Sequence, residues 1–230
     1  MRALIVTGGE APPPAYIRQL AAHCALVVAA DSGLDLCRKA GIIPDFAVGD
    51  FDSLTDATAL GVLPPERIFR YPADKDYTDT ELALNLAFEQ GATERIIAGG
   101  GGGRIDHLLA LRALFERNDP PAAWYIADAA ILYLSGGSTL RWRAAPGAMV
   151  SVFPLAPGAR DMNSRGLAWP LDGLEWTPGA FGISNRMEGK EAEIVTRAFP
   201  LLVVLPLDAE ILLWPIRQCE NSSALHQTGF

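Results

Sequence analysis

Cysteine is scarce in this chain, because its 230 residues include only Cys24, Cys37 and Cys219. The odd number and the wide spacing argue against a disulfide framework, and no C-x-x-C pair suggests a zinc site. Long apolar runs are missing too: none reaches the ~18 residues of a membrane helix, and Ala3–Thr7 is too short for a signal sequence. We therefore expect a soluble, cytoplasmic protein with no membrane partner.

Basic residues are also few. Lys and Arg number 19 against 27 Asp and Glu, which gives a net charge of −8. This charge argues against a nucleic-acid partner held by a broadly basic surface. Residues 31–81 contain eleven carboxylates and five basic side chains, so this segment alone contributes −6. Such an excess is either a solvated face or a site for a cation, and composition does not choose between them.

Strand and helix patterns alternate over the first part of the chain. Short Val-, Ile- and Leu-rich runs alternate with helical segments, which predicts a mostly parallel sheet with helices on both faces. The predicted strands are 3–7, 25–30, 45–49, 67–71, 95–98 and 124–127, and the predicted helices are 14–23, 33–40, 78–90 and 105–115. We expect residues 1–133 to form an α/β domain that holds the catalytic site.

The pattern changes near residue 130. Short apolar runs, broken by Gly and Pro, follow one another at intervals of roughly ten residues, which is typical of an antiparallel β-sandwich. The predicted strands are 131–134, 139–143, 149–153, 167–171, 193–196 and 201–205. We expect residues 134–218 to form this second domain and the polar residues 219–230 to be a mobile tail.

Several carboxylates follow the predicted parallel strands directly. Asp31 follows the second strand, Asp50 and Asp52 follow the third, and Asp76 and Asp79 precede the helix after the fourth. Ligands of open parallel sheets bind beyond the carboxyl ends of the strands. Mg²⁺ takes oxygen ligands and is usually held by one or two carboxylates together with substrate phosphates. The repetition therefore favours a magnesium site over a solvated loop.

Other polar segments have more than one interpretation. Thr78 with Glu81 fits a helix capping box, which does not exclude metal binding by Asp79. The run Gly99–Gly103 opens a helix and either cradles phosphates with its N–H groups or is a flexible turn. Arg104 can bind phosphate, whereas Asp106 and His107 also fit structural roles. Ser184–Asn185 fits a simple turn.

The motifs taken together resemble one family, thiamine pyrophosphokinase. The similarity covers about residues 3–205, and the motifs occur in the family's order. The matching segments are DSG at 31–33, GDFDS at 49–53, KDYTDTELAL at 75–84, GGRIDH at 102–107, GLAWPL at 166–171 and SN at 184–185.

The resemblance implies an α/β domain, a C-terminal β-sandwich, a homodimer, and transfer of a pyrophosphoryl group from ATP to the hydroxyl of thiamine, with Mg²⁺ as cofactor and AMP released. It assigns catalysis to four aspartates, Asp50, Asp52, Asp76 and Asp79. It places Asp50, Asp52 and Asp79 on the metal. It gives nucleotide binding to Asp31, Ser53, Lys75, Thr78, Gly102, Gly103, Arg104, Asp106 and His107. Ser184 and Asn185 fall in the thiamine segment, at a site shared between subunits.

Two further functions compete with this one. A pyrophosphokinase for another hydroxymethyl heterocycle, such as a pterin, would use the same donor site. A non-catalytic nucleotide-binding regulator would bind ATP without releasing AMP. Some relatives have a stacking Trp after the Ser-Asn strand, where this chain has none; Trp169 and Trp214 are the candidates to replace it.

Overall fold

The computed structural model describes residues 1–215, and its largest element is one sheet of ten strands. The strand order is β11-β9-β13-β7-β6-β5-β1-β2-β3-β4. The segment from β4 to β6 is parallel. Its strands are β1 (Arg2–Thr7), β2 (Leu26–Ala30), β3 (Phe46–Gly49), β4 (Ile68–Arg70), β5 (Glu94–Ala98) and β6 (Ala123–Ile126).

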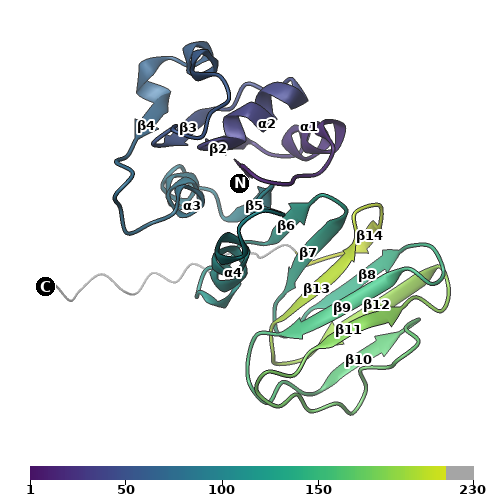
Figure 1. The fold of residues 1–230 in the computed structure, drawn as a ribbon. Coiled ribbons are helices and arrows are strands. Elements are labelled where there is room, and N and C mark those ends of the chain that lie inside the picture. Colours follow the sequence, from purple (N-terminus) through teal and green to yellow (C-terminus); the bar gives the residue numbers. More distant parts are fainter. Residues whose placement is uncertain (216–230) are drawn as a thin grey trace, which may run out of the picture.

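Helices cover both faces of this parallel segment (Figure 1). They are α1 (Pro14–Ala22), α2 (Gly33–Ala40), α3 (Asp79–Glu89) and α4 (Ile105–Ala113), and short 3₁₀ segments lie at Ala57–Val62, Pro65–Arg67 and Leu114–Glu116. Successive residues of a strand point to opposite faces. Leu4 and Val6 of β1 accordingly pack into the cluster that contains residues of α1 and α2, whereas Ala3 and Ile5 pack into the cluster of α3 and α4.

The same sheet continues into the second half of the chain. β7 (Ala129–Leu134) turns back from β6 and pairs with it antiparallel. The remaining strands of this part are β9 (Met149–Pro154), β11 (Gly182–Arg186) and β13 (Leu201–Pro206). The hydrogen-bonded ladder therefore crosses residue 133, where we drew the boundary between the two predicted domains, without a break.

A second sheet of four antiparallel strands, in the order β10-β12-β8-β14, completes the C-terminal half (Figure 1). Its strands are β8 (Thr139–Arg143), β10 (Met162–Arg165), β12 (Glu191–Thr196) and β14 (Glu210–Leu213). Trp142 and Ile194 of this sheet are fully buried in one cluster with Val152 and Val203 of the large sheet. Two sheets around one apolar layer are a β-sandwich, so the predicted class, α/β followed by an antiparallel sandwich, is confirmed.

Local errors fall mainly in the sandwich. The predicted strand 167–171 is wrong: Leu167 and Leu171 are buried, but only Leu167 makes a strand-type bridge, and Pro170 has no N–H to donate. The structure adds three strands, β10, β11 and β14, that the sequence pattern did not predict. Ser184–Asn185, which the sequence also allowed as a simple turn, lies on β11. The ladder of β11 with β9 shifts its register there, and Ser184 has a φ of 61°. The predicted tail 219–230 lies outside the described residues.

Candidate functional site

A cleft of about 820 Å³ opens at the carboxyl ends of β1, β2 and β5 and at the amino ends of α3 and α4. Most of the predicted donor-site residues line it. They are Asp31, Asp50, Asp52, Ser53, Lys75, Asp76, Thr78, Asp79, Gly102, Gly103, Arg104 and His107. The fold thus gathers these residues from four separate segments of the chain at one edge of the sheet, as the topology of parallel sheets predicts.

The segment Asp50–Phe51–Asp52 forms a tight turn after β3. Phe51 has a φ of 64° and is buried, with the guanidinium of Arg70 5.1 Å from its ring centroid. The backbone N–H of Asp52 donates to Asp50 Oδ1 at 3.2 Å, and Ser53 Oγ donates to Asp52 Oδ1 at 2.9 Å. The buried ring anchors the turn, while Asp50 and Asp52 both line the cleft.

Asp31 lies beside this turn and completes a carboxylate trio with Asp50 and Asp52. One carboxylate oxygen of each lies within 4.8 Å of the other two. The φ of Asp31 is 46°, and its N–H donates to the carbonyl oxygen of Val48 at 2.8 Å, which joins the ends of β2 and β3. Among residues 1–215, the buried Oδ1 of Asp31 has no hydrogen-bond partner. Hard oxygen ligands with an unsatisfied buried oxygen among them fit a divalent cation such as Mg²⁺.

Lys75 sits between two of the predicted catalytic carboxylates. Its Nζ lies 3.3 Å from Asp50 Oδ2 and 3.2 Å from Asp79 Oδ1, and it also donates to the carbonyl oxygen of Pro72 at 3.1 Å. Asp79 is therefore paired with Lys75 rather than with the trio. Whether it binds a metal stays a prediction, as do the roles of all the site residues.

The pKa shifts follow from these contacts. The hydrogen bond from the Asp52 N–H, together with Lys75, holds the pKa of Asp50 below its usual range. Burial raises the pKa of Asp79, although Lys75 acts in the opposite direction. Burial lowers the pKa of Lys75, but Asp79 and Asp50 outweigh it and the pKa is raised. Lys75 is therefore a fixed positive charge at neutral pH.

The amino end of α3 is fixed by two sets of hydrogen bonds. Thr78 is the N-cap: its Oγ1 accepts from the Glu81 N–H at 3.2 Å, and Glu81 Oε2 accepts from the Thr78 N–H at 2.9 Å. The predicted capping box is thus confirmed. One residue into the helix after Asp79, the buried hydroxyl of Thr80 bonds that of Thr7 at 2.8 Å, which attaches the helix to the end of β1.

The five glycines after β5 divide into two groups. The N–H groups of Gly99, Gly100 and Gly101 donate to carbonyl oxygens of Tyr125, Gly8 and Glu10. Within residues 1–215, the N–H groups of the other two, Gly102 and Gly103, donate no hydrogen bond to the protein. The first group holds the loop in place, so only the second, which the sequence assigned to the nucleotide, can offer N–H groups to a ligand.

The residues that follow this loop are exposed at the amino end of α4. Arg104 forms an ion pair with Asp106, and its Nε lies 3.1 Å from Asp106 Oδ1. The pairing raises the pKa of Arg104 and lowers that of Asp106. Arg104 and His107 line the cleft. Asp106 does not line the cleft, but its ion pair fixes the position of Arg104.

The two predicted thiamine residues lie elsewhere. Ser184 and Asn185 are on β11, which is the other end of the ten-strand order from β3 and β4. Asn185 is buried; its Nδ2 donates to the Trp169 carbonyl at 2.7 Å and its Oδ1 accepts from the Trp169 N–H at 3.1 Å. Asn185 thus fixes the backbone of Trp169, and Trp169 is 57% exposed. Trp214 is less exposed and donates its Nε1–H to the carbonyl of Tyr133.

Sequence reasoning missed some residues that shape the cleft. Gly8, Gly9 and Glu10 follow β1 and line it, and their position after a buried strand was a usable signal. Asp35 of α2 was also missed: it is buried, and its Oδ2 accepts from the Thr55 N–H at 2.9 Å, which ties the loop after Asp52 to α2. No local pattern marks this tertiary contact.

The fold and the cleft define an α/β protein with an appended β-sandwich and an acidic, glycine-lined site. Two family models match the chain: "Thiamin pyrophosphokinase, catalytic domain" over residues 17–121 and "Thiamin pyrophosphokinase, vitamin B1 binding domain" over residues 139–199. The two matches together span well over half of the chain. The chain belongs to the thiamin pyrophosphokinase family.

Individual relatives agree with this assignment. Thiamine pyrophosphokinase of Bacillus subtilis (strain 168) is 40% identical over 85 residues, which is 36% of this chain and 40% of that protein, so the aligned part is less than half of the relative. The structure of a thiamin pyrophosphokinase family protein from Enterococcus faecalis aligns with a TM-score of 0.72 at 27% identity, over 90% of this chain and all of the other. The Bacillus subtilis enzyme structure aligns with a TM-score of 0.74 over the same shares at 24% identity, which supports the fold.

Proposed function

We propose that this protein transfers the pyrophosphoryl group of ATP to the hydroxyl of thiamine, producing thiamine diphosphate and AMP. The observation that carries the proposal is the cleft, which combines a carboxylate trio, a paired lysine and two free glycine N–H groups. The match to a vitamin B1 binding domain supports thiamine over a pterin as the acceptor.

Mg²⁺ is the proposed cofactor, and Asp31, Asp50 and Asp52 would hold it. When bound, it supplies positive charge that neutralises phosphate oxygens. The Oδ1 of Asp31, which has no hydrogen-bond partner among residues 1–215, supports this assignment. Asp79 and Asp76 remain predicted catalytic residues, the former half-buried and paired with Lys75 and the latter exposed at the cleft.

The remaining charges in the cleft would bind and orient the triphosphate. The N–H groups of Gly102 and Gly103, at the amino end of α4, donate no hydrogen bond within residues 1–215 and suit phosphate oxygens. Lys75 and Arg104 both line the cleft and add positive charge to it. Transfer of this type depends mainly on position and charge stabilisation, and these four residues provide both. The thiamine oxygen bonds to the β-phosphorus, the bond from that phosphorus to the AMP oxygen breaks, and the hydroxyl proton leaves to solvent.

The acceptor site would require a second subunit. Between β11 and β2 there are six intervening strands, β9, β13, β7, β6, β5 and β1. Seven spacings of about 4.8 Å separate Ser184 from Asp31 by roughly 30 Å, too far for one thiamine to touch both. A homodimer in which β11 of one subunit faces the cleft of the other resolves the distance.

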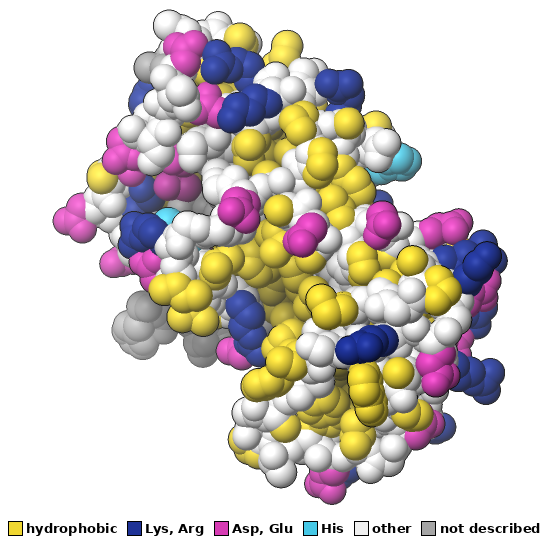
Figure 2. Space-filling model, turned by 45° about the vertical axis from the view of Figure 1, so that its right-hand side comes forward, with side chains coloured by type: hydrophobic (Ala, Val, Ile, Leu, Met, Phe, Trp, Pro, Cys, Tyr) yellow, Lys and Arg dark blue, Asp and Glu magenta, His cyan; other side chains and the backbone are white. Residues whose placement is uncertain are grey.

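Exposed apolar surface supports this dimer. Figure 2 shows hydrophobic side chains gathered in a band between the α/β half and the sandwich half. On and beside β9 and β11, Met149, Phe181 and Ile183 are each more than half exposed. Large apolar surfaces of this kind mark interaction sites.

A cytoplasmic location is proposed because two cysteines carry free thiols. Cys24 and Cys37 are both free, and burial raises the pKa of the Cys24 thiol to about 11 and that of Cys37 to about 12. Unpaired thiols are typical of reducing compartments. No helix within residues 1–215 is long and apolar enough to cross a membrane.

The direct test is incubation of the pure protein with ATP, MgCl₂ and thiamine, followed by chromatography of the products. We expect equal amounts of AMP and thiamine diphosphate. ADP as the product, or no product from folded protein, would contradict the proposal. The same assay with a hydroxymethyl pterin in place of thiamine separates the two acceptors.

A further inference from the structure

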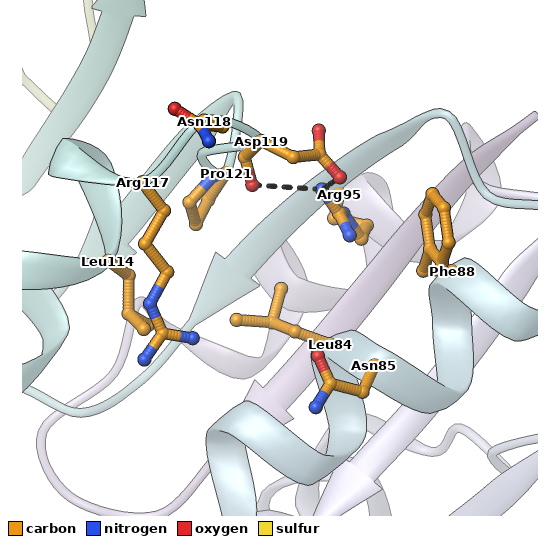
Figure 3. A pocket seen from close by; sticks show the side chains of 9 residues that line it. All are labelled: Leu84, Asn85, Phe88, Arg95, Leu114, Arg117, Asn118, Asp119 and Pro121. Carbon is orange, nitrogen blue, oxygen red and sulfur yellow. Dashed lines mark hydrogen bonds and ion pairs between the residues drawn. The ribbon is translucent and has the colours of Figure 1, made fainter. Parts of the chain in front are cut away.

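A second pocket adjoins the cleft, with which it shares only Leu114 among its lining residues, and lies on the same face of the sheet as α3. It has a volume of about 290 Å³ and is lined by the later turns of α3, the start of β5 and the segment before β6. Figure 3 shows two guanidinium groups, those of Arg95 and Arg117, on opposite sides of a floor that includes Leu84. None of these residues has a role in the proposed reaction.

The lining combines positive charge with apolar walls. Leu84, Phe88, Leu114 and Pro121 are the apolar members, and Asn85 and Asn118 add amide groups. Arg95, Arg117 and Asp119 are its ionisable residues, so their formal charges leave the lining at +1. A site of this size, with apolar walls and a few convergent polar groups, is typical of small-molecule binding.

Arg95 is a charged residue held inside this pocket. Its side chain is only 7% exposed and pairs with Asp119 through one terminal nitrogen. Its guanidinium carbon lies 5.5 Å from the Phe88 ring centroid. Its Nε is buried and has no hydrogen-bond partner in the described part of the chain. A buried donor without a partner is costly, so a ligand acceptor here would be favourable.

Arg117, across the pocket, is half exposed and forms an ion pair with Glu81 Oε1. The other oxygen of Glu81 accepts from Thr78 in the capping box of α3. A ligand anion would therefore compete with Glu81 for Arg117. This competition provides a test in which two substitutions shift the affinity in opposite directions.

We propose that this pocket binds a small organic monoanion: an anionic head between Arg95 and Arg117, and a flat apolar body against Phe88 and the leucines. Benzoate is the probe, because it has one carboxylate and a planar ring. A dissociation constant on the order of 1 mM is expected for a ligand of this size.

The test is a titration of the isolated protein, without ATP or metal, followed by NMR of the methyl groups of Leu84, which lines this pocket and not the cleft. Arg117→Gln should weaken benzoate binding at least about tenfold. Glu81→Gln should tighten it about threefold or more, since it frees Arg117 while Gln still fits the N3 position of a capping box. Arg104→Gln, an exposed arginine of the cleft that is also paired with a carboxylate, should leave it unchanged.

Three results would overturn the proposal. The first is the absence of saturable shifts in these methyl groups. The second is equal binding of benzyl alcohol, which has the ring but no charge. The third is a loss of affinity in Arg104→Gln matching that in Arg117→Gln, which would place the anion in the cleft. Because binding is measured without substrates, these outcomes do not depend on the proposed reaction.

Discussion

Replacing Asp52 by Asn should stabilise the metal-free protein and nearly abolish its activity. Asp52, Asp50 and Asp31 have carboxylate oxygens within 4.8 Å of one another. In water, two unit charges at this distance repel by about 0.9 kcal/mol. Asp52 takes part in two such pairs, and screening at physiological ionic strength reduces their sum to about 1 kcal/mol. Asn keeps the oxygen that accepts from Ser53, so the repulsion is the main term removed.

Thermal unfolding in EDTA measures the first effect. For a chain of this length, about 1 kcal/mol corresponds to a rise in Tm of roughly 2–4 °C. Addition of MgCl₂ should stabilise the wild type more than the variant, because the variant has lost a ligand. AMP release should fall about a hundredfold or more, as when a charge-stabilising group is removed from an active site.

A matched control separates local repulsion from the overall negative charge. Asp208→Asn removes one charge from an exposed residue in the turn after β13, and it should change neither the Tm in EDTA nor the activity. The reasoning is refuted if Asp52→Asn lowers the Tm in EDTA, or if it releases AMP at the wild-type rate.

Three further predictions concern neighbouring features. Lys75→Met removes the partner of two cleft carboxylates and should lower kcat/KM for ATP about a hundredfold; an unchanged value in steady-state kinetics would contradict this role. Gly33→Ala would place a Cβ 1.9 Å from the carbonyl oxygen of Val6. Urea denaturation should therefore show a decrease of more than about 2 kcal/mol in the free energy of unfolding. A decrease below about 0.5 kcal/mol would argue against the close packing of α2 on β1. Burial raises the pKa of Glu81, but its hydrogen bonds from Thr78 and its ion pair with Arg117 together outweigh burial and lower the pKa. The stabilisation of wild type over Glu81→Gln should therefore be present above the usual carboxyl pKa and disappear as the pH falls through the lowered one. A pH-independent difference in unfolding free energy would refute this.

The parallel part of the fold was readable from the sequence because its signals are local. Buried parallel strands appear as continuous Val- and Ile-rich runs, and the capping box of α3 is a four-residue pattern. The predicted helix 33–40 matches α2, and the predicted strand 3–7 differs from β1 by one residue. In the sandwich the same approach failed at 167–171, where two buried leucines anchor a loop rather than a strand.

The site was predicted in part for the same reason. Asp31, Asp50 and Asp52 come directly after two neighbouring strands, and Asp76 and Asp79 lie between a third strand and its helix, so they were expected at one edge of a parallel sheet. The importance of Asp35 could not be predicted, because the contact that ties the loop after Asp52 to α2 is a hydrogen bond to Thr55, twenty residues away. The pocket of Arg95 and Arg117 also has no motif, because it exists only where α3, β5 and the segment before β6 come together.

The sequence by itself determined the order of the elements, the placement of acid at the strand ends and the glycine loop, since each depends on residues close together in the chain. The tertiary structure alone decided which groups are available for chemistry. It paired Lys75 with Asp50 and Asp79 and used three glycine N–H groups within the fold. Within residues 1–215 it left Asp31 Oδ1 without a hydrogen-bond partner and the N–H groups of Gly102 and Gly103 unused. The physical reason is that a hydrogen bond or charge pair depends on distances between atoms, which the fold sets and a linear pattern does not contain.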